Sequence, residues 1–488
     1  MSDLNHKDTE STVNKADEGL ASKAVSRREF LKIAGVAGAA VGLGGGLGGL
    51  LAACGEEAET TTTGEVTTTS GATTTSGATT TVSAGAEEGR PIKLGLVSPK
   101  TGNFAVFAIS DDWQLGHVRE ALKDGIVAGD GKKRMIEIVV RDSQSDSNRA
   151  AQVAADLVQL DNVDMLLASG TPDTCNPVAD QGEALGCPVL MSFSPWQALF
   201  IRSGQPAEFK WAYGNMLGSE LTIQSFTDAF ETSGVQTNKK VGMLFQNDAD
   251  AQGWMDPSAA PKVFAEKGYT LVVPEYYSVP AEDFTQQISM FKSEGCEIIC
   301  GTNDPPWFSN FLSQSLQQGF QPKFISSGKA LIFPQAVMSY PNQGLGLIGE
   351  AAWHPSWKIK DTLSDLDSEG LAADYEAKTG EQWTAAIGTY GKLEWAVDVY
   401  RRAINPEDKE SVVEAIKTTK GTFQQGYMDF TEPVDPNGRH VILNNYKCNI
   451  GAQQWRKGTK YPVEPVVISN AAAPGTTVQD KAQPMVYS

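Results

Sequence analysis

Histidine is scarce in this 488-residue sequence, which contains four. Three follow the N-terminal region, namely His117, His354 and His440, and each stands alone, as surface or packing residues do. The Gly-x-Ser-x-Gly, P-loop and His-Glu-x-x-His patterns are missing as well. Residues 344–349 match Gly-x-Gly-x-x-Gly but follow a Pro-Asn turn and open no helix, so we interpret them as a connection. We therefore expect no enzyme, no metal site and no cofactor.

Basic residues are too few for a nucleic-acid surface. The chain has 40 Lys and Arg against 59 Asp and Glu, a formal charge of −19, and no basic run lies beyond the N-terminal region. Such a chain repels a phosphate backbone, which excludes nucleic acid as a partner. Its 41% of hydrophobic residues can still fill the cores of two or three domains.

The N-terminal region has no uninterrupted apolar run. Eight glycines dilute residues 33–50, which disfavours a transmembrane anchor. Arg27 and Arg28, followed by Glu-Phe-Leu-Lys, precede this weakly apolar segment, and the arrangement resembles the twin-arginine export signal. The sequence therefore predicts export across the cytoplasmic membrane.

A lipid attachment site follows at once. Leu51-Ala52-Ala53-Cys54 resembles the lipobox of bacterial lipoproteins, which implies that residues 1–53 are a signal peptide and that lipid on the Cys54 sulfur anchors the chain. Residues 54–89 are rich in Thr, Ser and Gly and are predicted to be a flexible tether. We expect a domain held on the outer face of the cytoplasmic membrane.

Cysteine is also rare, since five remain beyond Cys54. An odd number in an oxidising compartment leaves at least one thiol unpaired within the chain. Cys175 and Cys187 flank a predicted helix, whose length disfavours a disulfide between them.

Residues 91–330 alternate short apolar runs with helical patterns, in two units of matching order. In the second unit, residues 247–254 and 301–307 are predicted as polar loops. This order predicts an α/β fold of two lobes with parallel sheets. Helix is expected over most of 369–402, and closing strands at 426–430 and 446–455 around a turn at 435–438. The other predicted strands are 92–97, 136–141, 165–168, 189–191, 241–246, 269–276, 297–300 and 323–326.

The stretch 165–196 carries the strongest signal of a binding site. Its two apolar runs each end in a polar loop, so two parallel strands end side by side. The loops bring hydroxyls and free backbone N–H groups, which suit an anionic or strongly polar ligand. Half of a small-molecule cleft is therefore predicted from Ser169, Thr171, Ser192 and Ser194.

The ordered set of these features resembles the type I periplasmic solute-binding proteins of branched-chain amino acid, amide and urea transporters. It includes Leu94-Gly-Leu-Val-Ser-Pro99, Arg141-Asp142, residues 166–170 and Gly426-Tyr-Met-Asp-Phe430. The resemblance implies two Rossmann-like lobes joined by a three-crossing hinge. It places lobe 1 at 90–212 and 353–435, lobe 2 at 213–352 and 436–470, and a C-terminal tail at 471–488.

In that family the first lobe holds the ligand carboxylate and the second often supplies aromatic side chains. The resemblance thus implies lobe 1 contacts from Ser169, Gly170, Thr171, Ser192, Ser194 and Trp196. It implies lobe 2 contacts from Trp254 and Trp307. The alternative for each tryptophan is packing at the lobe interface.

The family glutamate that pairs with a ligand ammonium is missing, because the matching loop reads Ser326-Ser-Gly-Lys329-Ala330. Asp304, or else Asp248 or Asp250, is the candidate to replace it. Without such an acid, a Lys329 side chain that faces the cleft would favour a carboxylated or amide ligand. The alternative is that Lys329 points to solvent, as lysines usually do.

The resemblance implies a monomeric solute receptor of an ABC importer. Its partners are a small amino acid, amide or organic acid, the permease subunits, and membrane lipid through Cys54. A ligand sensor for a membrane signalling protein is the first alternative, and an extracytoplasmic α/β hydrolase is the second.

Overall fold

A computed structural model describes residues 85–202, 204–432, 434 and 442–487 of the chain. The predicted signal peptide with Arg27 and Arg28, Cys54, most of the tether, His440 and the turn at 435–438 lie outside the described residues. Within those residues, none of the helices combines the length and the apolar character that a membrane span needs.

The first lobe is built on a six-stranded sheet in the order β18-β9-β6-β5-β1-β4, with every neighbouring pair parallel. Its central strands are nearly continuous apolar runs because helices cover both faces. The predicted strands of this unit are confirmed. The strands are β1 Ile92–Ser98, β4 Ile136–Asp142, β5 Met165–Ser169, β6 Val189–Pro195, β9 Ala212–Leu217 and β18 Asn445–Lys447.

Helices follow the strands of this lobe as the apolar periodicity predicts. In α3, Ala150, Val153 and Leu157 are fully buried, and Asp146 caps the first turn by accepting a hydrogen bond from the Arg149 N–H. The helices are η1 Ala105–Ala108, α2 Asp111–Ala121, α3 Ser147–Gln159, α4 Pro172–Leu185, α5 Trp196–Phe200, α12 Ser368–Thr379, η4 Ala385–Tyr390, α13 Gly391–Arg402 and α14 Lys409–Lys417.

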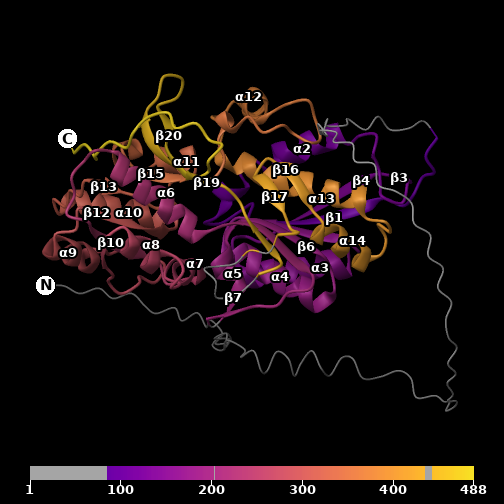
Figure 1. Ribbon diagram of the computed structural model, residues 1–488, viewed down its shortest axis with the longest axis horizontal. Coiled ribbons are helices and arrows are strands. Elements are labelled where there is room, and N and C mark those ends of the chain that lie inside the picture. The colour runs from indigo at the N-terminus through magenta and orange to yellow at the C-terminus, as the bar shows by residue number, and fades with distance from the viewer. Residues whose placement is uncertain (1–84, 203, 433, 435–441, 488) are drawn as a thin grey trace, which may run out of the picture. The chain divides into compact units, whose positions relative to one another are not determined.

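The second lobe has a parallel sheet in the order β11-β10-β12-β13, with β14 also paired to β12. A single bridge from Ser326 to Ile348 leads to the antiparallel strands β15-β19-β20. Figure 1 shows β10, β12 and β13 grouped with α8, α9 and α10. The strands are β10 Lys240–Phe245, β11 Thr270–Val272, β12 Ile298–Asn303, β13 Phe324–Ile325, β14 Gly328–Lys329, β15 Ile348–Ala351, β19 Ile450–Lys457 and β20 Val463–Ala472.

Two segments of this lobe predicted as loops are helical. Asp248 caps α7 by accepting a hydrogen bond from the Ala251 N–H, so 247–254 is mostly helix. Strand β12 runs on to Asn303 and α10 begins at Pro305, which puts Trp307 in the first turn of α10. The helices are α6 Ser219–Thr232, α7 Ala249–Trp254, α8 Ala260–Glu266, α9 Thr285–Glu294, α10 Pro305–Gln317, α11 Pro334–Met338 and η2 Pro341–Gly344. The short helix η3 Pro355–Trp357 follows β15 and packs on α12 of lobe 1.

The chain crosses between the lobes three times. The crossings follow β9, β15 and β18, because each strand is succeeded by an element of the other lobe. The predicted fold class of two parallel-sheet lobes joined by three crossings is confirmed. The glycine-rich residues 344–349 end η2 and enter β15, as the interpretation as a connection predicts.

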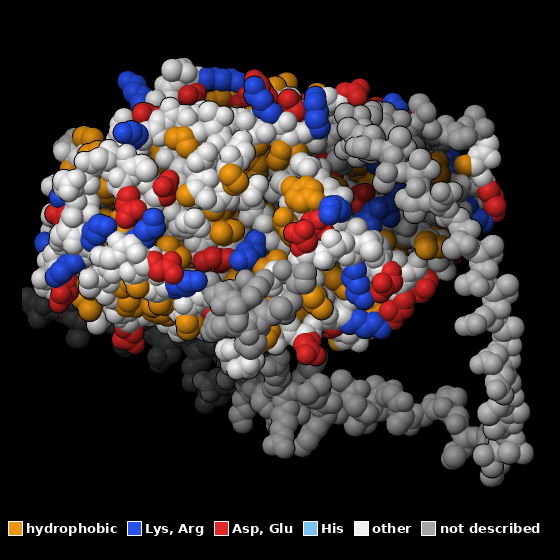
Figure 2. Space-filling view, viewed as in Figure 1, with side chains coloured by type: hydrophobic (Ala, Val, Ile, Leu, Met, Phe, Trp, Pro, Cys, Tyr) orange, Lys and Arg blue, Asp and Glu red, His pale blue; other side chains and the backbone are white. Residues whose placement is uncertain are grey.

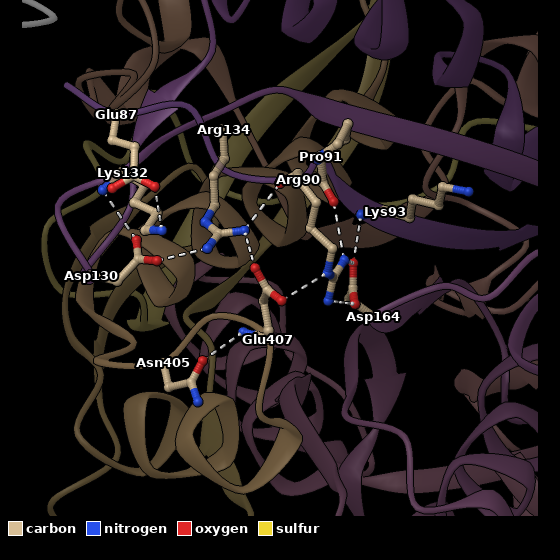
Figure 3. Close-up of polar contacts among 10 residues, drawn as sticks. All are labelled: Glu87, Arg90, Pro91, Lys93, Asp130, Lys132, Arg134, Asp164, Asn405 and Glu407. Atoms are coloured by element: carbon tan, nitrogen blue, oxygen red, sulfur yellow. Dashed lines mark hydrogen bonds and ion pairs between the residues drawn. The ribbon is translucent and has the colours of Figure 1, made fainter. Parts of the chain in front are cut away.

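The start of the described chain is fixed to lobe 1 by a network of ion pairs (Figure 3). The guanidinium of Arg90 lies 2.8 Å from Asp164 and 3.4 Å from Glu407. Arg134, 2% exposed, pairs with Asp130 at 2.6 Å and with the same Glu407 at 2.8 Å. Arg134 belongs to β3 Lys133–Arg134, which forms a hairpin with β2 Ile126–Val127.

Charges of both signs are mixed on the molecular face in Figure 2. Acidic and basic side chains alternate over that face, and no extended positive area appears on the part of it that the structure describes.

Candidate ligand-binding cleft

The structure brings the predicted lobe 1 residues together at the carboxyl ends of two neighbouring strands. Ser169 ends β5 and lies opposite Ser192 of β6. Gly170 follows with φ +119°, a conformation that favours glycine, and Thr171 begins α4. The first turn of α4 and the end of β6 thus form one polar edge.

Three hydroxyl oxygens of this edge have no hydrogen-bond partner among the described residues. They are Oγ1 of Thr171 and Oγ of Ser192 and Ser194, and each residue is at most 1% exposed. Buried hydroxyls are ordinarily paired, so an unpaired set needs an explanation. These three residues, called here the hydroxyl wall, can donate hydrogen bonds to a carboxylate or amide oxygen.

An aromatic contact joins the lobes beside the hydroxyl wall. Phe107 of η1 lies against Gly170, where an added Cβ would come within 3.6 Å of the Phe107 Cβ. Its ring meets Phe333, which precedes α11 in lobe 2, edge to face with centroids 4.7 Å apart. Sequence reasoning missed both residues. No pattern in the sequence around Phe107 or Phe333 singles out either residue.

Lys329 lies on the facing side, in lobe 2, and is buried with 6% exposure. Its ammonium is 3.0 Å from a carboxylate oxygen of each of three aspartates. The alternative of a lysine pointing to solvent is therefore wrong. We call Lys329 with Asp248, Asp250 and Asp304 the charged wall.

The fold explains how these four side chains meet. Asp248 and Asp250 start α7 after β10, Asp304 starts α10 after β12, and Lys329 pairs with Asn303 in the parallel β12–β14 ladder. Burial alone lowers the pKa of Lys329, but the charges of the three aspartates outweigh it and hold the pKa well above its usual value. Lys329 is therefore a permanent cation.

Two further acids border the charged wall. Glu350 of β15 accepts hydrogen bonds from the Thr222 hydroxyl at 3.1 Å and the Lys329 N–H at 3.4 Å. Burial, together with the charge of Asp250, raises the pKa of Glu350 to about 7. Burial raises the pKa of Asp250 to about 6 and also raises that of Asp173, in the first turn of α4. The charge of Lys329 opposes the rise at Asp173, so the field of the charged wall reaches lobe 1.

The three candidate tryptophans have different surroundings. Trp254 is 1% exposed and packs between Phe226 and Phe245, with centroids 6.3 Å and 6.2 Å away. Trp196 is fully buried, and its indole N–H donates to Glu220. The ring of Trp307 packs partly on the lobe 2 core, while its buried indole N–H has no hydrogen-bond partner among the described residues.

A pocket of about 360 Å³ opens where the two lobes meet. Lobe 1 contributes the first turns of α3 and α4, and lobe 2 contributes Ala249 of α7. Asp173 and Asp180 make its lining acidic. Figure 1 shows α7 beside α5, so this opening lies along the seam between the lobes.

The remaining candidate groups for chemistry are buried or paired. Five free cysteines are buried, and burial raises the pKa of the Cys175 and Cys187 thiols to about 12, which keeps them unreactive. The disfavoured Cys175–Cys187 disulfide is not formed. His117 pairs with Asp361 at 3.0 Å, and burial lowers the pKa of His354 to about 4. Within the part of the chain that the structure describes, no group of His, Cys, Asp and Glu side chains is arranged to hold a metal ion.

Two family models match the chain. One, described as periplasmic binding protein, matches residues 91–443. The other, described as a twin-arginine translocation pathway signal sequence, matches residues 24–44 and so includes Arg27 and Arg28.

Solved structures with this fold differ in their ligands. Leucine-binding LivK of Thermotoga maritima is 19% identical, with 78% of this chain and 99% of LivK covered and a TM-score of 0.60. LivJ of Streptococcus pneumoniae with isoleucine is 16% identical, with 77% and 99% covered and a TM-score of 0.59. A solute-binding protein of Rhodopseudomonas palustris with 3,4-dihydroxybenzoic acid is 18% identical, with 80% and 98% covered and a TM-score of 0.59. At these identities the likeness shows the fold.

Proposed function

Because the chain belongs to the periplasmic binding protein family and carries a twin-arginine signal sequence, we propose that it is the solute-binding lipoprotein of an ABC importer. It binds a small polar solute between its lobes and delivers it to a membrane permease. The three unpaired hydroxyls of the hydroxyl wall support this role most directly, since buried donors at the ends of parallel strands are what a polar solute needs.

The ligand presents a carboxylate or amide oxygen to lobe 1. Thr171, Ser192 and Ser194 donate hydrogen bonds to it, and Ser169 and Gly170 shape the same edge. Lobe 2 offers the unpaired indole N–H of Trp307. Trp196 and Trp254 act in this proposal as packing residues that hold α5 and α7 in place.

Binding and closure can be measured together on a fragment that starts at Arg90. Calorimetry against leucine, glutamate, urea and benzoate identifies the ligand class, and X-ray scattering then reports the radius of gyration with and without the solute that binds. We expect a smaller radius in the bound state, because three crossings allow the lobes to hinge. An unchanged radius at saturation would argue for a rigid site on one lobe.

Anchoring through Cys54 is the second part of the proposal. Leu51-Ala52-Ala53-Cys54 directly follows the matched export signal. Mass spectrometry of the membrane fraction is expected to find a mature chain that begins with a diacylated Cys54. Cys54→Ala serves as the matched variant, and its release into the soluble fraction is expected. A wild-type chain with an unmodified Cys54 in the medium would contradict anchoring.

A further inference from the structure

We propose that Lys329 is a specificity-determining residue whose ammonium permanently fills a three-carboxylate subsite, so that the solute bound in the cleft carries no ammonium group at this end. This inference rests on the proposed function and names its ligand class as organic acids or amides without an α-amino group. It differs from a lysine that binds the solute and from an aspartate that pairs with a solute ammonium.

The ammonium of Lys329 is surrounded by carboxylates of its own lobe. An ammonium has three N–H donors, and the Nζ atom has three carboxylates at 3.0 Å, from Asp248, Asp250 and Asp304. All three aspartates therefore face the lysine. The sequence left two possibilities open, a free lysine and a free aspartate, and the ion pairs remove the free lysine. Of the three contacts the one to Asp248 is a hydrogen bond, and Oδ1 of Asp250 and of Asp304 has no hydrogen-bond partner among the described residues.

The backbone at Lys329 is an independent sign that this position is built for its side chain. Lys329 has φ +51°, in the left-handed region that residues with a Cβ rarely adopt. Strain of this kind persists where surrounding structure enforces it, and it concentrates at ligand sites. The preceding Gly328 is also constrained, since an added Cβ would lie 3.1 Å from Glu350 and from Trp254.

Protonation removes part of the surplus of carboxylate charge. Burial raises the pKa of Glu350 to about 7, so this acid is partly protonated at neutral pH, whereas Asp250, with its pKa raised to about 6, takes up a proton in mildly acidic solution. The hydroxyl wall opposite is uncharged and keeps unpaired oxygens. A solute ammonium placed beside Lys329 has to share these three carboxylates with a like charge in a buried site, whereas a carboxylate directed to the hydroxyl wall meets no such competitor.

Chemical rescue tests whether the subsite is shaped for an ammonium. Lys329→Ala removes the atoms of n-propylammonium, so we expect added n-propylammonium chloride to raise the melting temperature of this variant. n-Propanol and sodium chloride are expected to have no such effect. Wild type and Lys323→Ala serve as controls, because Lys323 is an exposed lysine of lobe 2 that pairs with Glu297. Lys329→Ala/Asp250→Asn, with one carboxylate fewer, provides a second background if the single variant folds poorly.

Matched solute pairs test the specificity itself. Leucine and 4-methylpentanoate differ only in the ammonium, as do phenylalanine and 3-phenylpropanoate. For the pair that fits the cleft, we expect wild type to bind the acid without the amino group about 100-fold more tightly by calorimetry. Lys329→Ala is expected to lose most of that preference and to gain affinity for the amino acid.

The outcomes separate this inference from the function on which it rests. Wild-type preference for an amino acid would overturn the role of Lys329 and leave a solute receptor in place. Failure of n-propylammonium to stabilise both variants would also overturn it. If every solute fails to bind and to compact the protein while rescue succeeds, the assignment of the subsite stands and the proposed receptor function loses its support.

Discussion

The two walls of the cleft satisfy their polar groups in opposite ways. The hydroxyl wall has neutral side chains, and Thr171, Ser192 and Ser194 keep oxygens without a partner inside the described chain. The charged wall has a full set of internal ion pairs around Lys329. A buried neutral donor without a partner costs about 1 to 3 kcal/mol and is available to a solute, whereas an unpaired buried charge costs more and must be paired before any solute arrives.

Residues that stabilise the fold and residues that bind the solute are expected to lie on different walls. Substitutions in the charged wall are expected to change folding, because removing one member leaves buried charge. Substitutions in the hydroxyl wall are expected to change affinity and leave folding nearly unaltered. Four experiments, each on one substitution and its controls, test this contrast and are given from the largest expected effect to the smallest.

Lys329→Met is expected to destabilise the fold by about 3 to 5 kcal/mol, since it leaves three buried carboxylates without their cation. Asp250→Asn is the matched contrast within the same wall. Burial raises the pKa of Asp250 to about 6, which means that its charged form is unfavourable in the folded state. Replacing this carboxylate by a neutral amide is therefore expected to leave the free energy of unfolding at pH 8 unchanged or to increase it. Urea unfolding at pH 8 measures both variants. An equal decrease in the free energy of unfolding for both variants would show that the charged wall has no surplus of negative charge.

Glu350→Gln is expected to flatten the pH dependence of stability. The pKa of Glu350 rises from 4.5 to about 7 on folding, so the native state retains a proton that the unfolded chain releases. Its stabilising contribution is complete below pH 4.5 and is lost as the pH rises through 7, by roughly 2 to 3 kcal/mol. Urea unfolding from pH 5 to pH 8 checks this. If the free energy of unfolding changed with pH in the same way for wild type and variant, the raised pKa of Glu350 would be contradicted.

Thr171→Ala is expected to weaken solute binding by about 10-fold, equivalent to about 1.4 kcal/mol, and to leave the free energy of unfolding within about 0.5 kcal/mol of wild type. The hydroxyl it removes has no partner in the described chain. Thr171→Ser keeps the oxygen and is the control. A loss of stability without a loss of affinity would place Thr171 in the scaffold.

Gly253→Ala is expected to weaken affinity two- to three-fold through the contact between lobes, a cost of about 0.5 kcal/mol. Its Cβ would lie 3.2 Å from the Ala198 nitrogen and 3.3 Å from the Gln197 Cβ, so α7 could no longer sit as close to α5. Gly116→Ala, in α2 with no atom within 4 Å of the added Cβ, is the matched control. Calorimetry on both variants measures the difference, and equal affinities would show that the α5–α7 contact has no part in closure.

The alternation of strands and helices was predictable because it depends on the local spacing of apolar residues. Buried parallel strands such as β1 and β5 are short apolar runs, and α3 repeats its apolar residues at helical spacing. The gathering of Ser169, Thr171 and Ser192 followed from one rule, that parallel strands end at the same edge of a sheet. The family match and the strand order confirm the predicted fold, and the register of β5 with β6 places Ser169 opposite Ser192.

The burial of Lys329 was not predictable in the same way. Lysine is seldom buried, and its three partners come from α7 and α10, each brought close only by the order of the parallel strands. The contact of Phe107 with Phe333 depends likewise on how the lobes meet. Helix α7 was missed because six residues with a glycine show little periodicity, although Asp248 was a capping signal.

The ion-pair network at the start of the domain fixes the entering chain to lobe 1. Glu88 forms a parallel β-bridge with Lys133, and Arg90 forms ion pairs with Asp164 and Glu407 (Figure 3). The entering chain is therefore held to lobe 1 by several contacts. A force applied at the N-terminal end of the described chain passes first into lobe 1, while lobe 2 is linked to lobe 1 by the three crossings and by contacts such as that of Phe107 with Phe333. If the chain is anchored through Cys54 as proposed, lobe 1 stays next to the anchor, and closure would bring lobe 2, with Lys329, towards it.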